Sequence, residues 1–247
     1  MKGDLKNSTV SELQIMHFEL SFPQSTLFDK HIPKQKFYDN LNVTPALKRS
    51  FTGDVEEIVW KNKLSAATMN VADGQTVKEI EILELHLKKK VYDKKILIQI
   101  DRGIPYHILF VLVYGGEVKL CIGYKEQSGN NQAALSTPVY YETDWQPEAA
   151  VTLTLDGLNM DAVYENFVRQ IAGGALAISA AGQTENAGTL SEDIEREEKR
   201  KELQKQIEAL EKKIACEKQF NRQMELWDEV KRIREMMNGV ENIGEKS

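Results

Sequence analysis

The chain has 247 residues, of which 41% are hydrophobic and 28% charged, and its formal net charge is −6. This composition is that of a globular domain of ordinary size with an appendage, and the length excludes a single very large core. The negative charge excludes a protein that coats nucleic acid through its overall field, because neutralising phosphates requires a concentrated Lys/Arg surface.

Three helices are expected in the first quarter of the chain, after a leader of unassigned role (residues 1–19). The first covers about residues 31–38. Thr44 and Pro45 supply an N-cap and a proline at the first helical position, so a second helix is expected from there toward residue 51. Asp54 can cap a third helix, whose apolar residues lie one turn apart: Val55, Ile58, Val59 and Trp60.

The hydrophobic period then changes to that of a sheet. Residues 77–87 predict a strand, with a bulge where Ile82 and Leu83 interrupt the alternation. Asp93 is expected to cap a helix over residues 94–101, which Gly103 can close in the left-handed conformation.

Two β-rich runs, residues 108–114 and 118–124, are separated by Gly115 and Gly116 and predict a β-hairpin. The first run is apolar on both faces, which is typical of a central strand covered on both sides.

The domain is expected to close with two strands, residues 138–143 and 151–155, and a helix that begins at Asp161. This order of elements predicts an α+β fold, a mixed α/β domain over residues 20–172, because it holds no repeated βαβ unit. Residues 173–190 are rich in Gly, Ala, Ser and Thr, a composition suited to a linker.

Residues 191–237 contain neither Gly nor Pro and are rich in Glu, Lys, Arg, Leu and Gln. Helix is the only element that suits this composition, and one continuous helix would be about 70 Å long. We expect a coiled-coil-prone helix, followed by a disordered tail over residues 238–247.

The apolar residues of this segment fall into two sets. The first has the 4-3-4 spacing of a coiled-coil seam: Leu203, Ile207, Leu210 and Ile214. The second lies nearly opposite on a straight helix: Phe220, Met224 and Trp227. Either one helix offers two faces, or the chain turns within residues 216–221 into a helical hairpin. We expect self-association through the first set and docking of a partner, or of the chain's own domain, through the second; the reverse division is the alternative.

Catalytic and cofactor motifs are absent from the sequence. It holds no phosphate-binding loop, no dinucleotide-binding glycine pattern, no H-E-x-x-H and no C-x-x-C, so no cofactor is expected. The two cysteines, Cys121 and Cys216, have neither disulfide-scaffold density nor zinc-site spacing, and no apolar stretch approaches membrane-spanning length. These features predict a cytoplasmic protein that is not an enzyme.

Two other site hypotheses stay open. Restriction-type nucleases hold a metal with an Asp and a Glu-x-Lys on a neighbouring strand, and Asp101, Glu117 and Lys119 match those types. Glu79, Glu81 and Glu84 form a second carboxylate cluster on one predicted strand, although alternation turns Glu81 away from Glu84. A local contact with DNA would use the lysines between the strand 77–87 and the first residues of the following helix: Lys88, Lys89, Lys90, Lys94 and Lys95.

Three separated segments carry a resemblance to a known family. They are FPQST with IPKQKFY at residues 22–38, IDRGIPY at residues 100–106 and EKQFNR at residues 217–222. Over about residues 20–237 the chain resembles the bacterial domain-of-unknown-function family 4391. Genes of that family tend to lie beside helicases, DNA methyltransferases and restriction-like subunits, so the resemblance implies a role in anti-phage defence. Together these observations predict an assembly subunit of a DNA-processing complex, with helicase or methyltransferase subunits as its partners.

Overall fold

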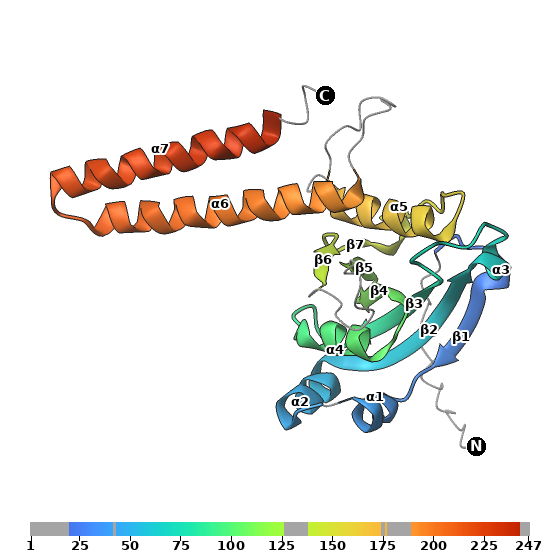
Figure 1. Cartoon of the computed structure of the whole chain (residues 1–247). Coiled ribbons are helices and arrows are strands. Elements are labelled where there is room, and N and C mark those ends of the chain that lie inside the picture. Colours follow the sequence, from blue (N-terminus) through green and yellow to red (C-terminus); the bar gives the residue numbers. More distant parts are fainter. Residues whose placement is uncertain (1–19, 42, 126–137, 174–175, 177–188, 243–247) are drawn as a thin grey trace, which may run out of the picture.

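The computed structural model describes residues 20–41, 43–125, 138–173, 176 and 189–242. In this part of the chain a seven-stranded mixed sheet carries helices on both faces, and a helical hairpin extends away from it (Figure 1). The predicted α+β fold is confirmed. The leader, most of the expected linker and residues 243–247 lie outside the described residues.

The elements follow one another in a simple order. The strands are β1 (Leu27–His31), β2 (Val55–Ser65), β3 (Glu79–Leu87), β4 (His107–Tyr114), β5 (Glu117–Tyr124), β6 (Val139–Glu142) and β7 (Gln146–Pro147). The α-helices are α1 (Lys34–Asn40), α2 (Pro45–Asp54), α3 (Ala66–Met69), α4 (Lys95–Gly103), α5 (Met160–Ala172), α6 (Leu190–Cys216) and α7 (Phe220–Asn242). Two 3-10 turns, η1 (Gln24–Thr26) and η2 (Glu148–Ala150), complete them.

The strands lie in the order β1-β2-β3-β4-β5-β6, and β7 pairs with β5. The β3–β4 pair is parallel and is joined across one face of the sheet by α4, whereas the other ladders between the named strands are antiparallel. The predicted β4–β5 hairpin is present, and Gly115 and Gly116 have φ values of 58° and 80°. Positive φ at both central positions is what a tight hairpin turn requires.

Strand β4 lies in the middle of the core, as its apolar sequence predicts. Leu109 and Val111 pack on one face of the sheet with α5, whereas Phe110 and Leu112 pack on the other with α2 and α4. The β4 side chains Leu109, Phe110 and Leu112 have no exposed surface.

The expected third helix over residues 55–60 is wrong, because these residues begin the 11-residue strand β2. Their spacing fits either element, and pairing on both sides decides between them: Ile58 pairs with Leu85 in β3, and Val59 pairs with His31 in β1. Asp54 ends α2 instead of capping a helix, and its carboxylate accepts a hydrogen bond from the Asp93 N–H at 3.0 Å.

Two smaller expectations also fail. Residues 151–155 form no ladder in the described structure, because the side-chain amide of Gln170 in α5 bonds both the N–H (2.7 Å) and the C=O (2.9 Å) of Thr154. Gly103 ends α4 without the expected left-handed conformation. It is small for another reason: a Cβ there would lie 2.1 Å from Cδ2 of Leu41. The bulge is real but lies on β2, opposite Ile82 and Leu83.

The C-terminal segment is a hairpin of two antiparallel helices, α6 and α7 (Figure 1). The chain turns at residues 217–219, where the Glu217 carboxylate accepts the N–H groups of Lys218 (2.7 Å) and Gln219 (2.9 Å). Helix α7 continues to Asn242, past the expected end at residue 237. None of the helices in the described ranges is both long and apolar enough to cross a membrane.

The base of the hairpin belongs to the core of the domain. Leu190 and Ile194 in the first turns of α6 join the same apolar cluster as α5. Arg169 of α5 pairs with Asp193 at 2.7 Å, and the Lys201 Nζ lies 5.6 Å from the ring centroid of Tyr141 in β6. The hairpin is therefore fixed to the sheet domain over its first three turns.

Candidate functional site

The apolar face of α6 is covered by α7 of the same chain. The four seam residues predicted for self-association, Leu203, Ile207, Leu210 and Ile214, are all buried. They pack against Leu226, Val230 and Ile233 of α7, and the Arg234–Glu211 pair (2.8 Å) links the two helices. In this arrangement α7 occupies the seam, so the seam is not available to a second copy.

The outer face of α7 carries the second predicted set. Phe220, Met224 and Trp227 have exposed fractions of 71%, 47% and 46%. They lie one turn apart at the start of α7, so they form one apolar stripe next to the turn of the hairpin, at the end far from the sheet (Figure 1). We call these three residues the tip stripe.

The predicted DNA-contacting lysines are engaged by acidic and carbonyl groups. Lys89 pairs with Asp54 at 2.8 Å, Lys94 pairs with Glu142 at 2.8 Å, and Lys90 pairs with Glu117. Lys88 donates to the carbonyl of Thr52 at 2.9 Å, and Lys95 begins α4. Three of the five charges therefore face a carboxylate, which weakens the local positive field that a phosphate backbone would need.

The three residues of the nuclease hypothesis are not brought together. Asp101 lies against Gly123 near the end of β5, whereas Glu117 is the first residue of that strand. At the rise of an extended strand, six residues separate these positions by about 20 Å. Lys119 instead approaches Glu142 at 3.5 Å. In the described residues no group of three or more His, Cys, Asp or Glu side chains could hold a metal ion.

The carboxylates of β3 lie on opposite faces of the sheet, as alternation predicts. Glu84 is buried and bonds the ring of His86 at 2.5 Å, with Glu57 at 3.9 Å from the same nitrogen. Burial works to lower the pKa of His86, but the two carboxylates raise it overall. Glu81 points to the other face of the sheet.

His107, at the start of β4, packs its ring against Tyr164 with centroids 4.4 Å apart. Burial, together with the charge of Lys125, lowers its pKa to about 4. The ring is therefore neutral at pH 7 and packs against an aromatic side chain.

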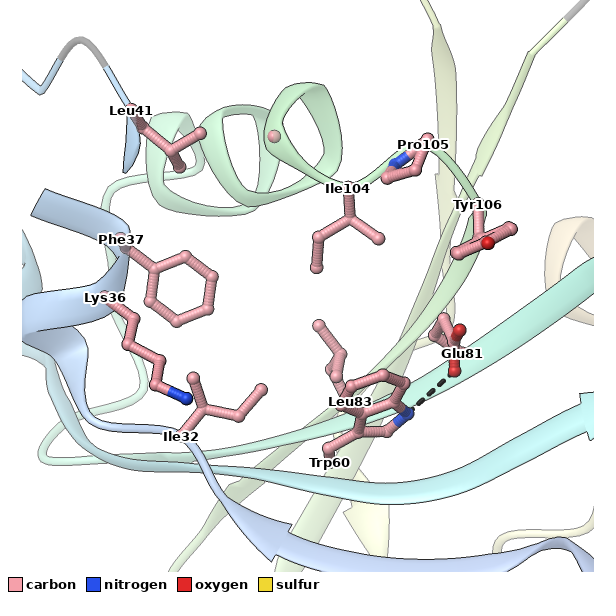
Figure 2. A pocket seen from close by; sticks show the side chains of 11 residues that line it. Ile32, Lys36, Phe37, Leu41, Trp60, Glu81, Leu83, Ile104, Pro105 and Tyr106 are labelled. Carbon is pink, nitrogen blue, oxygen red and sulfur yellow. Dashed lines mark hydrogen bonds between the residues drawn. The ribbon is translucent and has the colours of Figure 1, made fainter. Parts of the chain in front are cut away.

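Glu81 lies in the wall of a pocket of about 330 Å³ (Figure 2). The pocket is formed between α1, the chain that follows α4, and strands β2 and β3. Its lining is mostly apolar: Ile32, Lys36, Phe37, Leu41, Trp60, Glu81, Leu83, Gly103, Ile104, Pro105 and Tyr106.

The Glu81 carboxyl group is only half satisfied there. One oxygen, Oε2, accepts a hydrogen bond from the Trp60 indole N–H at 2.7 Å. The other, Oε1, is buried and has no hydrogen-bond partner among the described residues. Burial raises the pKa of Glu81 to about 7 from its ordinary value of 4.5, against the lowering effect of the Trp60 hydrogen bond.

The sequence did not predict this pocket. The spacing of the apolar residues predicts a helix at Trp60, and strand alternation says of Glu81 only that it points away from Glu84. The available signal is a carboxylate on the same side of the strand as Leu83 and Leu85, because such a group is buried only at a considerable cost in free energy.

Comparison with known proteins identifies a family and no closer relative. The model of the family described as domain of unknown function (DUF4391) matches residues 20–237. No curated protein and no solved structure matches the chain.

Proposed function

Because the chain belongs to the DUF4391 family, whose model spans the sheet domain and the hairpin alike, we propose that both parts act as one non-catalytic assembly subunit. The sheet domain is the rigid base, and the tip stripe of the hairpin binds a protein partner. The observation that supports this proposal most directly is the exposure of Phe220, Met224 and Trp227 on a helix whose inner face is already buried.

The chemistry of the tip stripe suits a protein interface. Tryptophan and other large side chains dominate the binding energy of interfaces, and an apolar helix face commonly docks in a groove. The stripe is already ordered by the packing of α7 on α6, so binding would require little loss of conformational entropy. A partner with an apolar groove of about two helical turns would cover all three side chains.

The base of the hairpin supports a role in positioning. Beyond Lys201, which lies over Tyr141, α6 continues for 15 residues to Cys216. At 1.5 Å per residue this places the turn about 22 Å beyond Lys201. A partner bound at the tip stripe would be held at a defined distance from the sheet domain.

The family resemblance supplies the setting for this interaction. Since genes of this family tend to lie beside helicases, DNA methyltransferases and restriction-like subunits, the proposed complex is a DNA-processing assembly of anti-phage defence. In it the tip stripe would dock on the helicase or the methyltransferase.

Co-expression tests the proposal. The tagged full chain is produced together with a candidate helicase or methyltransferase from the same organism, and stable complexes are identified by size-exclusion chromatography with light scattering. The double variant Phe220→Glu/Trp227→Glu should lose the complex, whereas Met236→Glu, which changes an exposed apolar residue (53%) farther along α7, should keep it.

Two results would contradict the proposal. A complex that persists unchanged in the double variant would remove the tip stripe from the interface. A double variant of lower mass than the wild type in the absence of any partner would show that the stripe joins two copies of this chain instead.

A further inference from the structure

We propose that the pocket beside Glu81 binds a small, largely apolar amine, with the Glu81 carboxylate accepting its N–H groups. This inference concerns the sheet domain and does not depend on the proposed role of the hairpin. It rests on a cavity and on a buried acceptor within it.

The buried acceptor is the first argument. Glu81 is only 1% exposed. Its Oε1 atom has almost no contact with solvent and no hydrogen-bond partner in the described part of the chain. Leaving a charged oxygen in this state is costly, and most buried polar groups are paired. Figure 2 shows Oε2 turned to Trp60 and the second oxygen turned away from it, on the side where Tyr106 lies. A ligand that brings an N–H donor to Oε1 would remove the deficit.

The shape and lining of the pocket define the rest of the ligand. A volume of about 330 Å³ lies at the lower end of the range for small-molecule sites. Phe37 and Leu83 are buried in its floor, and Trp60 and Tyr106 place aromatic rings next to Glu81. Aromatic faces attract cations as well as apolar groups. A one-ring or two-ring body with an amine on a short chain matches this lining.

The pocket is accessible from solvent. Pro105, Tyr106 and Lys36, all exposed, stand on its rim, whereas Glu81 lies in the wall. A ligand would enter with its amine first and leave its apolar body between Phe37 and Ile104.

The charge of Glu81 selects an amine over other donors. Two charged groups already act on Glu81, the Glu79 carboxylate and the Lys63 ammonium, and these two pair with each other at 2.9 Å. An alcohol could donate one hydrogen bond to Oε1 but would bring no further positive charge to Glu81. An ammonium group supplies both the donor and the opposite charge, and charge-assisted hydrogen bonds are the stronger ones. A carboxylate ligand would bring a like charge to Glu81 and should be excluded.

Calorimetric titration of the full chain at pH 8 tests this selection with three ligands of similar size. Phenethylamine is the cation, 2-phenylethanol the neutral analogue and 3-phenylpropionate the anion, and tryptamine probes a two-ring body. We expect one or both amines to bind at least about tenfold more tightly than the alcohol, a difference of about 1.4 kcal/mol. No heat of binding is expected for the anion.

Variants and pH locate the interaction at Glu81. Glu81→Gln should weaken amine binding at least about tenfold, whereas Glu56→Gln, which removes the same charge from an exposed position of β2, should not. In the wild type, amine binding should weaken as the pH falls from 8 to 5.5, because protonation of Glu81 removes the charge while the ligand amine remains protonated. The charged groups that face Glu81 are the Glu79 carboxylate of the same strand and the Lys63 ammonium of β2. Lys63 keeps its charge over this range, because its pairing with Glu79 raises its pKa. This comparison needs no variant and holds even if Glu81→Gln fails to fold.

The proposal is overturned by any of three results. These are no binding of either amine up to its solubility limit, equal affinity for phenethylamine and 3-phenylpropionate, and amine affinity that is the same in wild type and folded Glu81→Gln. A failed hairpin–partner test would leave all of these outcomes unaffected.

Discussion

Lys125 and Asp101 form an ion pair in the interior of the domain, with Nζ 2.6 Å from Oδ1 and side chains only 7% and 1% exposed. The hydroxyl of Tyr140 donates a further hydrogen bond to Oδ2 of Asp101 at 2.7 Å. The pair joins the C-terminal half of α4 to the end of β5, so Asp101, a metal ligand in the nuclease hypothesis, has a structural role here.

Breaking this pair should be strongly destabilising. Lys125→Met leaves the Asp101 carboxylate buried without its counter-charge, and we expect a loss of about 3–5 kcal/mol in the free energy of unfolding, measured in urea. The double variant Asp101→Asn/Lys125→Met should recover most of that loss. Arg222→Met, at the exposed Arg222–Glu225 pair, is the control and should not move the transition. Additive losses in the double variant would show that the two groups do not interact.

Glu81 should make the stability of the domain depend on pH. The folded protein holds the Glu81 proton up to a pKa of about 7, whereas the unfolded chain releases it near 4.5. The folded state therefore binds more protons between these values, and stability falls as the pH rises from 4.5 to 7. Glu81→Gln should be more stable than the wild type at pH 8, by up to about 3 kcal/mol, and should lose most of that advantage at pH 4.5. An advantage of the same size at both pH values would contradict the raised pKa.

Asp161 should make the stability of the domain change with pH in the opposite direction. Its carboxylate accepts the backbone N–H groups of Gln75 (2.5 Å), Thr76 (3.1 Å) and Val77 (2.8 Å). Burial works to raise the pKa of Asp161, but these hydrogen bonds hold it below the ordinary value. The stabilisation is therefore present above the unfolded pKa and is lost as the pH falls through the folded pKa.

Asp161→Asn tests that role, because an amide nitrogen cannot accept from these donors. We expect a loss of about 2 kcal/mol at pH 7. The difference from the wild type should shrink as the pH is lowered toward 3, in denaturant melts at each pH. A difference that stays constant with pH would show that the carboxylate charge is not involved.

Phe110 should be essential for folding of the sheet domain. It has no exposed surface and lies in central strand β4, so Phe110→Asp places an unpaired charge in the core. That cost of several kcal/mol is comparable with the whole stability of a domain. The variant should lose its cooperative thermal transition, whereas Leu158→Asp, at a position 90% exposed, should melt like the wild type. A soluble, cooperatively melting Phe110→Asp protein would refute the burial.

The hairpin should open without unfolding the sheet domain. Val230 is 1% exposed in the α6–α7 contact, so Val230→Asp should release α7. Hydrogen exchange followed by mass spectrometry should then show loss of protection over residues 220–238 and unchanged protection in β4. Lys231→Asp, at the exposed neighbouring position, is the control. Loss of protection in β4 as well would mean that hairpin and sheet fold as one unit.

Local signals in the sequence predicted the elements that are determined locally. Thr44 accepts the N–H of Leu47 as the N-cap of α2, and Gly115 and Gly116 form the β4–β5 turn. Strand β2 was missed because its partners are remote: the choice between helix and strand at Ile58 depends on Leu85, which is 27 positions away. No local pattern contains that information.

The candidate sites also differ in how far local sequence predicts them. The tip stripe follows from the spacing of three residues on one helix, whereas the closure of the seam depends on where the chain turns back. The pocket is still harder to predict from sequence, because its walls come from four separated segments: residues 32–41, 60, 81–83 and 103–106. Only the completed sheet, with α1 and α4 on its face, brings them around Glu81.

The antiparallel pairing of α6 and α7 fixes the distance between the turn of the hairpin and the sheet domain. Removing one heptad from each helix, at matched positions, keeps the apolar seam in register. Each such step shortens the hairpin by about 10 Å. A protein held at the tip stripe would move toward the sheet by the same step, so the number of helical turns in α6 and α7 would set its distance from the sheet domain.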